Sequence, residues 1–552
     1  MSEGSLARNA AVIALALVAT GVTLALHHPV LPLARTHVPI SAFHPGHVFI
    51  FDHIARMVTG DAPWSLVTER LAFPRGAALR PIAWGPALLA LPFRPLLGPI
   101  GAYNAVVWLS PALSALAAWG LLRRLTGAGP LAAAGAALPF ALSPFALGCL
   151  ASGQTAKVQL WALALPLWAA SVSLERPWLG LPLLAGTMVA ASFTSPSLAL
   201  QLPFALALLA AGGVALGWRG AARGAAVLGV AALALVPAWA FFSPTTAARS
   251  LDGPIQVLQP ALRPTQTADI GYAIARLHST LLPRVTLPVE PTDTAHLTAL
   301  PWPILAVAVL GLPWSRKGRW IGLGLVLIGL VLASGEYLWW GDGFAEFGGR
   351  RLELPALTLR RMGYPLGASG MYYRAIATAT LGLSVLLAAA AARLGGWRGA
   401  ALATLVGLGA TAEAVRLSAP LWPRAAYAPI SADLAARMAE DPVPGAVLDL
   451  PMEHHGNQAQ GYVLAAVQHG RATNGAPLLL RSEDLPHLKA LKQDLTTALT
   501  APDPNAALAA LGVRYVVWHP IGWDGGPRRE DVEAALGPGH AEGGVRWWRV
   551  GQ

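Results

Sequence analysis

The sequence predicts a polytopic α-helical membrane protein with about eleven spans, followed by a small soluble α/β domain at the C-terminus. Of the 552 residues, 55% are hydrophobic and only 12% are charged, whereas an ordinary soluble domain has roughly 25% charged residues. The hydrophobic residues form long runs that are separated by short polar connections. Only the last part of the chain has the composition of a soluble domain.

The predicted spans are apolar stretches long enough to cross a bilayer as helices. They lie at 10–26, 101–122, 129–148, 156–173, 178–194, 196–216, 224–243, 298–313, 320–340, 371–392 and 399–416. Another run, 81–99, contains several prolines and Arg94. Because these residues disfavour a full crossing, we expect a re-entrant or interfacial element there. The first stretch is followed by no small-residue cleavage site, which favours a retained span over a signal peptide.

Basic residues in the short connections predict the orientation of the spans. The basic connections that fall on the side of Arg8 are Arg123–Arg124, Glu175–Arg176, Arg219 with Arg223, 315–319, and Arg393 with Arg398. The positive-inside rule makes this side, together with the N-terminus, cytoplasmic. We therefore expect a membrane domain, 1–418, with a large first outer loop, 27–100, and an extracytoplasmic domain, 419–552. The same rule explains the net charge of +11, so no nucleic-acid partner is expected.

The tail shows short helical and strand patterns in alternation. Residues 430–440 indicate a helix with Ser431 as its cap, and 445–451 indicate a buried strand. A second helix is expected at 504–511, before strands at 513–518 and 545–550. This alternation predicts an α/β domain.

A series of short motifs runs through the whole chain in a fixed order. The motifs are Leu71 to Leu79, Gly85 to Pro92, Ala102 to Trp108, Leu121 to Gly127, Ser143-Pro-Phe145 with Gly153-Gln154, Ser195-Pro-Ser197, Met371-Tyr-Tyr-Arg374 and Leu511 to Val517. In order and spacing they resemble bacterial members of the GT-C superfamily of membrane glycosyltransferases. That resemblance implies a GT-C-like membrane domain in a bacterial cytoplasmic (inner) membrane. It also implies hexosyl or pentosyl transfer from a polyprenyl-phosphate-linked sugar to an envelope glycan, lipid or protein acceptor on the outer face.

The resemblance also directs attention to the first outer loop. Members of the superfamily usually carry an acidic residue there, often as Gly-Asp, which acts on the acceptor. At this place the sequence reads Gly46-His47, and the nearest carboxylate is Asp52. Asp52 is therefore the candidate catalytic base, with His47 and His53 as candidate substrate-binding residues. The alternative is that Asp52 and Arg56 form an ordinary surface ion pair on an interfacial amphipathic helix.

Cations and amides near the outer ends of the spans are candidate ligands for a lipid phosphate. They are Arg75 and Arg80 in the first loop, Gln154 and Lys157 at the start of the fourth span, and Arg374 in a late span. Arginine binds phosphate in a bidentate way, and a charge within a span calls for a partner or a headgroup. If Lys157 faces Arg374 across a cavity, a phosphate site follows. The alternative for Arg374 is that it snorkels to the interface.

Histidines are concentrated in the first outer loop, and they raise the question of a metal. Six of the fourteen lie there: His27, His28, His37, His44, His47 and His53. Only His44 and His47 have a helical ligand spacing, and Pro45 lies between them, so no metal ligand is assigned. A divalent cation, Mg²⁺ or Mn²⁺, is left open as a cofactor.

The sequence is compatible with two classes of function. The first is a membrane glycosyltransferase that uses a polyprenyl-phosphate donor. The second is a non-catalytic GT-C-like scaffold, or a transporter or binding protein for lipid-linked glycans, which the departure at Gly46-His47 motivates. A transporter would usually show internal repeats with paired broken spans, and the sequence shows no convincing repeat.

Overall fold

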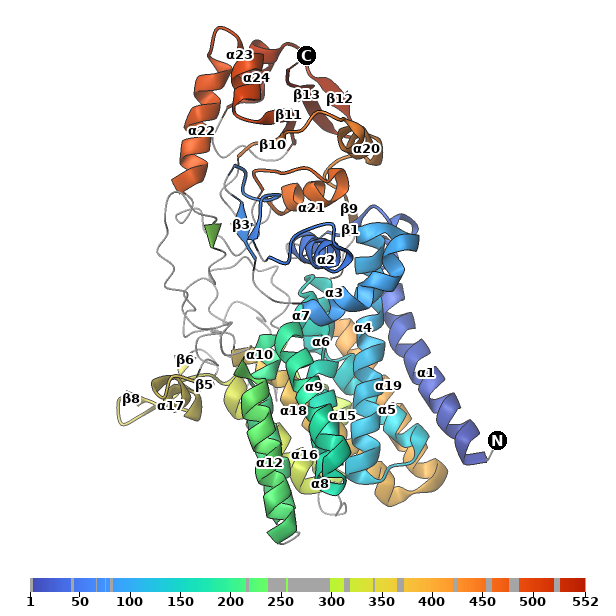
Figure 1. The fold of residues 1–552 in the computed structure, drawn as a ribbon. Coiled ribbons are helices and arrows are strands. Elements are labelled where there is room, and N and C mark those ends of the chain that lie inside the picture. Colours follow the sequence, from blue (N-terminus) through green and yellow to red (C-terminus); the bar gives the residue numbers. More distant parts are fainter. Residues whose placement is uncertain are drawn as a thin grey trace.

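The computed structural model describes most of the chain. The described residues are 3–40, 44–65, 67–74, 76–79, 83–214, 218–236, 255–256, 298–311, 318–340, 343–364, 372–419, 422, 425–452, 459–475, 486–520 and 527–551. A bundle of long helices forms one part of the molecule, and a mixed α/β domain formed by the C-terminal residues stands over one end of it (Figure 1). We call this end of the bundle the domain end.

Each of the eleven apolar stretches is helical over at least part of its length. The helices are α1 (Glu3–Leu26), α4 (Arg94–Thr126), α5 (Pro130–Ala141) with α6 (Pro144–Ala151), α7 (Thr155–Val158) with α8 (Trp161–Glu175), α9 (Pro177–Thr194), α10 (Pro196–Ala199) with α11 (Leu202–Val214), α12 (Trp218–Ala234), α15 (Trp302–Gly311), α16 (Arg319–Ala333), η5 (Tyr372–Ala375) with α18 (Ile376–Leu394), and α19 (Gly396–Ser418). Among the described residues, six helical runs are long and apolar enough to cross a membrane, or seven if the bent pair α5–α6 is one span. The total of eleven spans stays a prediction.

Small residues let the central helices approach each other closely. A Cβ on Gly135 of α5 would lie 2.6 Å from the backbone of Ala403 in α19, and a Cβ on Gly407 would overlap the carbonyl of Gly135. A Cβ on Gly329 of α16 would likewise overlap the backbone of Ala379 in α18. Membrane helices associate through such contacts because lipid offers no hydrophobic drive for their packing.

The short basic connections meet at the end of the bundle opposite the domain. Arg124 forms an ion pair with Glu175 at 2.8 Å, and Arg223 donates to the carbonyl of Leu174 at 2.7 Å. Gly318 lies against Thr126 in the same region. The N-terminus is at this end as well (Figure 1). The predicted grouping of the connections is therefore present in the structure, while the assignment of this end to the cytoplasm stays a prediction.

Several short elements cover the domain end. The helix α2 (His44–Thr59) and the pair α3 (Trp84–Ala90) and η2 (Leu91–Phe93) come from the first loop. The run 81–99, expected to be interfacial, thus contains short helical pieces with a break at Gly98, whose φ is 71°. Other small elements are η1 (Leu31–Leu33), β2 (Val67–Thr68), β3 (Ala77–Ala78), β4 (Ile255–Gln256), β5 (Trp339–Trp340), β6 (Gly343–Phe344), β7 (Glu346–Phe347), β8 (Arg350–Arg351) and α17 (Pro355–Arg361).

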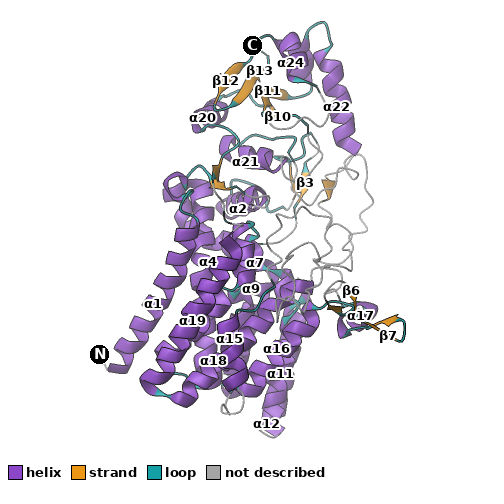
Figure 2. Cartoon of the chain, turned by 180° about the vertical axis from the view of Figure 1, so that it is seen from behind, coloured by secondary structure: helices purple, strands orange, loops and turns teal. Residues whose placement is uncertain are grey.

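The C-terminal domain is built on a four-stranded sheet in the order β10-β11-β13-β12 (Figure 2). The strands are β10 (Ala446–Leu450), β11 (Val513–Trp518), β12 (His540–Glu542) and β13 (Val545–Arg549), of which β10 and β11 are parallel. The helices are α20 (Ala432–Glu440), α21 (Ala459–His469), α22 (Pro486–Leu499), α23 (Pro504–Ala510) and α24 (Arg529–Leu536). The predicted cap of α20 is present, since the hydroxyl of Ser431 accepts from the amide of Leu434 at 3.1 Å.

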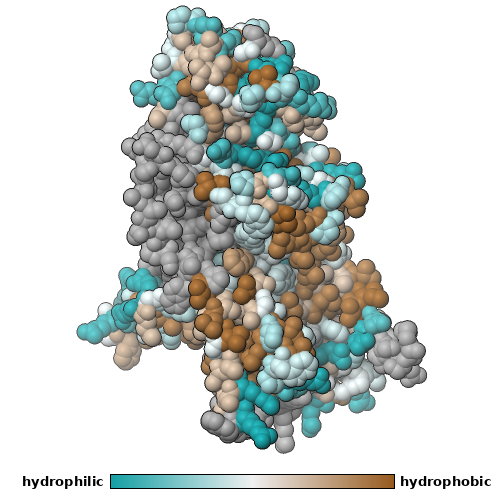
Figure 3. Space-filling view, in the orientation of Figure 1, coloured by the Kyte–Doolittle hydropathy of each residue, from teal (hydrophilic) through white to brown (hydrophobic). Residues whose placement is uncertain are grey.

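The membrane part and the C-terminal domain are joined by backbone pairing. Strand β1 (Val38–Pro39) of the first loop pairs antiparallel with β9 (Ala426–Tyr427), and the amide of Ala72 donates to the carbonyl of Gly475 at 2.9 Å. Hydrophobic residues gather over the helical bundle, and hydrophilic residues are more frequent over the domain (Figure 3). Exposed apolar side chains such as Leu17 of α1 fit a surface that faces lipid.

Candidate functional site

The candidate base Asp52 lies on α2, which is packed between the bundle and the C-terminal domain. Helix α2 contacts α3 and α4 on one side and α21 on the other. Its apolar residues, among them Phe49, Phe51 and Ile54, are buried. Because these residues flank Asp52 on the same helix, the carboxylate is buried as well. Asp52 is 1% exposed. The carboxylate therefore does not form a surface ion pair, although its partner at position 56 is as expected.

Three arginines from three different segments converge on this carboxylate. Asp52 Oδ2 accepts from Arg56 Nε at 3.0 Å and from Arg70 Nη1 at 2.6 Å, and Oδ1 accepts from Arg94 Nη2 at 2.6 Å. Arg70 also donates through Nη2 to the carbonyl of Ala466 in α21, at 2.6 Å. We call these four residues, Asp52, Arg56, Arg70 and Arg94, the Asp52 cluster. One carboxylate and three guanidinium groups leave it with two net positive charges.

The charge state of Asp52 follows from this arrangement. Burial raises the pKa of the carboxyl, but the neighbouring guanidinium groups, Arg70 first, outweigh burial and hold the pKa below its ordinary value. Asp52 is thus anionic at neutral pH. The cavity beside it, lined also by Arg94 and Ala87, has a volume of about 10 Å³, close to the minimum for one water molecule. Asp52 is therefore ionised, as a general base must be, but both of its carboxylate oxygens already accept hydrogen bonds from arginines.

The two histidines predicted to bind substrate differ in their surroundings. His53 is buried, and its Nε2 donates to the carbonyl of Ser65 at 2.8 Å, so that nitrogen is already used. Burial lowers the pKa of His53 below its ordinary value, and the nearby Arg70 adds to this effect. His47 is half-buried near the start of α2. Their roles in substrate binding stay predictions.

A hydrogen-bonded chain at the start of α2 was not predicted. His44 Nδ1 and the hydroxyl of Tyr103 are 2.7 Å apart, and the same hydroxyl lies 2.7 Å from Thr155 Oγ1. Among the residues that the structure describes, none forms a hydrogen bond with Nε2 of His44. Gly153, with a φ of 75°, lies so close to His44 that a Cβ would be 2.7 Å from it. The turn that carries Gln154 and Lys157 therefore lies directly against the start of α2.

Other buried polar atoms without a partner lie nearby. They are Trp84 Nε1 on α3, and Thr194 Oγ1 and Ser195 Oγ at the turn between α9 and α10. These elements touch, since the amide of Ala83 donates to the carbonyl of Thr194 at 3.2 Å. The Trp161 ring, next to α7, closes on Gly85 of α3 from the other side. We call His44, Trp84, Thr194 and Ser195 the unpartnered polar group. The general pattern of buried polar atoms is that they are paired, so a group of exceptions marks a place where a polar ligand can bind.

Arg374 is 8% exposed and lies in η5, at the same end of the bundle. The ring of its neighbour Tyr373 is in edge contact with Phe145 of α6, at 6.3 Å between centroids. Helix α7, which carries Lys157, follows α6 in the chain. That these two cations face each other stays a prediction.

Glu336 is a buried carboxylate that the sequence did not single out. It is 1% exposed, and its Oε1 accepts from the Tyr372 hydroxyl at 2.7 Å and pairs with Arg360 at 3.1 Å. Its Oε2 has no partner. The sequence after α16 contains several acidic residues, and it gives no sign that Glu336 is buried while the others are not.

Not every predicted ligand can be placed. Arg75 and Arg80 lie outside the described residues. Within the parts of the chain that the structure describes, no three His, Cys, Asp or Glu side chains come together as a metal site would require. A bound Mg²⁺ or Mn²⁺ stays a prediction.

Solved structures provide the comparison that places this fold. The arabinofuranosyltransferase AftD from Mycobacteria matches 97% of this chain with a TM-score of 0.53 and 18% sequence identity. The chain has the GT-C fold. It spans 40% of the length of AftD. No protein-family model and no curated protein matches the sequence.

Two further solved structures match at lower similarity. The oligosaccharyltransferase AglB from Archaeoglobus fulgidus has a TM-score of 0.47 and 12% identity over 92% of this chain and 69% of its own. ArnT from Cupriavidus metallidurans has a TM-score of 0.46 and 13% identity over 92% of each chain. The assignment of the GT-C fold rests on AftD, whose TM-score is above 0.5.

Proposed function

We propose that this GT-C protein transfers a sugar from a polyprenyl-phosphate donor to an envelope glycan, lipid or protein on the outer face of a bacterial inner membrane. The observation that carries the proposal is the unpartnered polar group, which lies at the domain end of the bundle. A sugar phosphate attached to a lipid needs such a place, where hydrogen bonds are available at the boundary of a lipid-facing surface. The sugar transferred is a hexose or a pentose.

The positive charge at this end supports a phosphate-containing donor. The Asp52 cluster carries two net positive charges, and Lys157 and Arg374 lie on elements at the same end of the bundle. Guanidinium groups bind phosphate in a bidentate way and keep their charge at a membrane surface. We assign Gln154, Lys157 and Arg374 to the donor, with Arg75 and Arg80 as further cations from the first loop.

Asp52 is the proposed general base of the reaction. It takes the proton of the acceptor hydroxyl while the acceptor oxygen bonds to the anomeric carbon, and the bond from that carbon to the phosphate oxygen breaks. The leaving group is polyprenyl phosphate, whose charge the cations stabilise. Because both oxygens of Asp52 accept from arginines, the base becomes available when the donor phosphate draws one of these arginines away.

The test is Asp52→Asn in the full chain, reconstituted in lipid nanodiscs with a polyprenyl-phosphate sugar. We expect transfer to fall by about 10²- to 10⁴-fold, the usual contribution of a general base, while donor binding persists. Glu175→Gln is the matched control, because Glu175 lies at the opposite end of the bundle and is exposed. Transfer at the wild-type rate in the Asp52→Asn variant, with expression and folding intact, would remove Asp52 from the chemistry.

A non-catalytic scaffold that binds lipid-linked glycans is the second candidate. The observation in its favour is the saturation of Asp52 by three arginines beside a cavity of about 10 Å³. A scaffold of this kind binds the donor in nanodiscs but releases no polyprenyl phosphate when acceptors are added. Release of polyprenyl phosphate in proportion to the glycosylated product excludes it.

A further inference from the structure

A hairpin and a short helix project from the bundle beyond the end of α16. The hairpin consists of β7 and β8, which pair antiparallel with Phe347 opposite Arg350, and α17 follows it in the chain. These elements extend sideways from the bundle at the level of its domain end (Figure 1 and Figure 2). We call residues 345–363 the lateral arm.

The base of the lateral arm is fixed to the bundle. Ala356 and Leu357, on the inner face of α17, are buried. Glu336, which is buried just after the end of α16, accepts from the Tyr372 hydroxyl of η5 at 2.7 Å and pairs with Arg360 of α17 at 3.1 Å. The height of the arm therefore follows from the height of α16 and η5.

Tryptophans and helix length give the height of the arm in a bilayer. At the end of the bundle opposite the domain, Trp178, Trp320 and Trp397 are each the second residue of a helix, and all three are exposed. Exposed tryptophans at helix ends are typical of a membrane–water interface. Helix α16 starts at this interface, and its 15 residues rise about 22 Å, less than the roughly 30 Å of a hydrocarbon core. The base of the arm, which follows α16, therefore lies at the opposite interface and not in the water beyond it.

The exposed side chains of the arm are both apolar and cationic. Phe347 at the tip of the hairpin is 85% exposed, and Met362 just after α17 is 76% exposed. Arg350 and Arg351 are exposed on β8. Aromatic and cationic side chains together are typical of segments that lie in the headgroup layer, where the ring enters the acyl boundary and the cation stays with the headgroups. The arm therefore has the composition of a lipid-binding surface.

The charges of the arm favour an anionic lipid. The arm contains four arginines and two carboxylates. Arg361 donates to both carboxylate oxygens of Glu353, at 3.1 Å each, and Arg360 is paired with Glu336. The other charged side chains of the arm are two cations and one anion, which are Arg350, Arg351 and Glu346. One net positive charge results at the hairpin, and it complements an anionic headgroup better than a zwitterionic one.

We propose that the lateral arm binds anionic phospholipid headgroups of the leaflet at the domain end. The ring of Phe347 enters the acyl boundary, and the guanidinium of Arg350, its cross-strand partner, binds a lipid phosphate. The occupant is thus the membrane in which the bundle lies and with which the arm is level. Lipid binding by the arm requires neither a sugar donor nor transfer, so it is independent of the proposed function.

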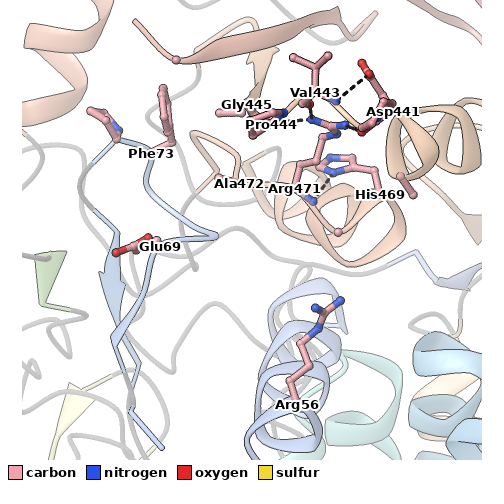
Figure 4. A pocket seen from close by; sticks show the side chains of 16 residues that line it. Arg56, Glu69, Phe73, Asp441, Val443, Pro444, Gly445, His469, Arg471 and Ala472 are labelled. Carbon is pink, nitrogen blue, oxygen red and sulfur yellow. Dashed lines mark hydrogen bonds between the residues drawn. The ribbon is translucent and has the colours of Figure 1, made fainter. Parts of the chain in front are cut away.

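A spin label on the tip of the arm measures its depth in phosphatidylglycerol nanodiscs that contain the full chain. Cys149, the single native cysteine, is buried, so a nitroxide attaches to an introduced cysteine. Phe347→Cys carries the probe, Leu17→Cys of α1 is the lipid-exposed reference, and Val443→Cys of the C-terminal domain (Figure 4) is the water-exposed reference. Oxygen, which concentrates in the bilayer, and a nickel chelate, which stays in water, relax the label on collision. We expect the oxygen-to-chelate ratio at position 347 to lie closer to that of the Leu17 reference than to that of the Val443 reference.

Charge variants in the same labelled chain test the choice of headgroup. The readout is the ratio of inserted to water-exposed label in phosphatidylglycerol relative to phosphatidylcholine. Arg350→Gln should lower this readout about fivefold, the effect of one basic residue near an anionic surface. Glu346→Gln, the matched variant on the other strand, should raise it by about the same factor. Positions 346, 347 and 350 are all exposed, so none of these substitutions disturbs the core.

Three outcomes would contradict lipid binding by the arm. An oxygen-to-chelate ratio at position 347 equal to that of the Val443 reference would place the tip in water and overturn the proposal. Low collision rates with both oxygen and the chelate would mean that a protein partner or a second copy covers the tip, which also overturns it. Equal insertion in the two lipids, unchanged by either charge variant, would overturn the assignment to anionic headgroups.

Discussion

Arg70 connects the Asp52 cluster to the C-terminal domain, and its loss has a calculable effect. One guanidinium donates to Asp52 at 2.6 Å and to the carbonyl of Ala466 in α21 at 2.6 Å. The side chain is 17% exposed, so solvent screens these bonds little. Opening of α21 breaks the bond to Ala466 and leaves the bond to Asp52 intact, so Arg70→Met removes about 1.5 kcal/mol, the value of one charge-assisted bond, from the docking of α21 on α2. The guanidinium carbon of Arg70 lies 5.2 Å from the centroid of the Phe49 ring, and methionine keeps an apolar side chain beside that ring.

Hydrogen exchange of the full chain in nanodiscs measures this docking directly. A loss of about 1.5 kcal/mol raises the exchange rate of α21 amides by about tenfold when α21 opens locally. Arg56→Met is the matched control: it removes one bond to Asp52 but leaves the link from Arg70 to α21, so we expect less than about a twofold change. Equal protection of α21 in the Arg70→Met variant and in the wild-type protein would refute the bridging role of Arg70.

Two other predictions concern stability. Since His469 has a pKa of about 3 when folded and 6.5 when unfolded, the unfolded state binds the extra proton as pH falls from 6.5 toward 3. Lowering pH from 7.5 to 5.5 should therefore cost about 1.4 kcal/mol at this residue, and His469→Phe should remove that part of the pH dependence in denaturant titrations. Gly407→Val should cost about 1–3 kcal/mol because its side chain would overlap Gly135. Gly229→Val, with open space around it, is its control in thermal unfolding, and equal melting temperatures would contradict the close contact of α5 with α19.

The fold was largely predictable because its strongest signals are local. Long apolar runs dictate helices in lipid, where every backbone polar group must be satisfied within its own segment. Within the tail, Ser431 before an amphipathic run and the apolar stretch of β11 gave the correct elements. The helices α21, α22 and α24 of the tail were not predicted.

The candidate site was less predictable because it depends on segments that are distant in sequence. Asp52 and Arg56 lie on one helix, and their spacing predicts their contact. Arg70 and Arg94 reach the same carboxylate from 18 and 42 residues away, and no spacing rule relates them to it. A single arginine in a polar loop does not indicate which distant carboxylate it will contact.

The alternative of a surface ion pair between Asp52 and Arg56 does not hold because the carboxylate is buried. Burying Asp52 with one arginine would leave part of its desolvation uncompensated, since several kcal/mol are lost for each ion taken out of water. Burial becomes tolerable when three guanidinium groups satisfy both oxygens. Two positive charges are then in excess at the domain end of the bundle. An anionic headgroup at the domain end would balance that excess, which links the burial of one carboxylate to the class of donor that we propose.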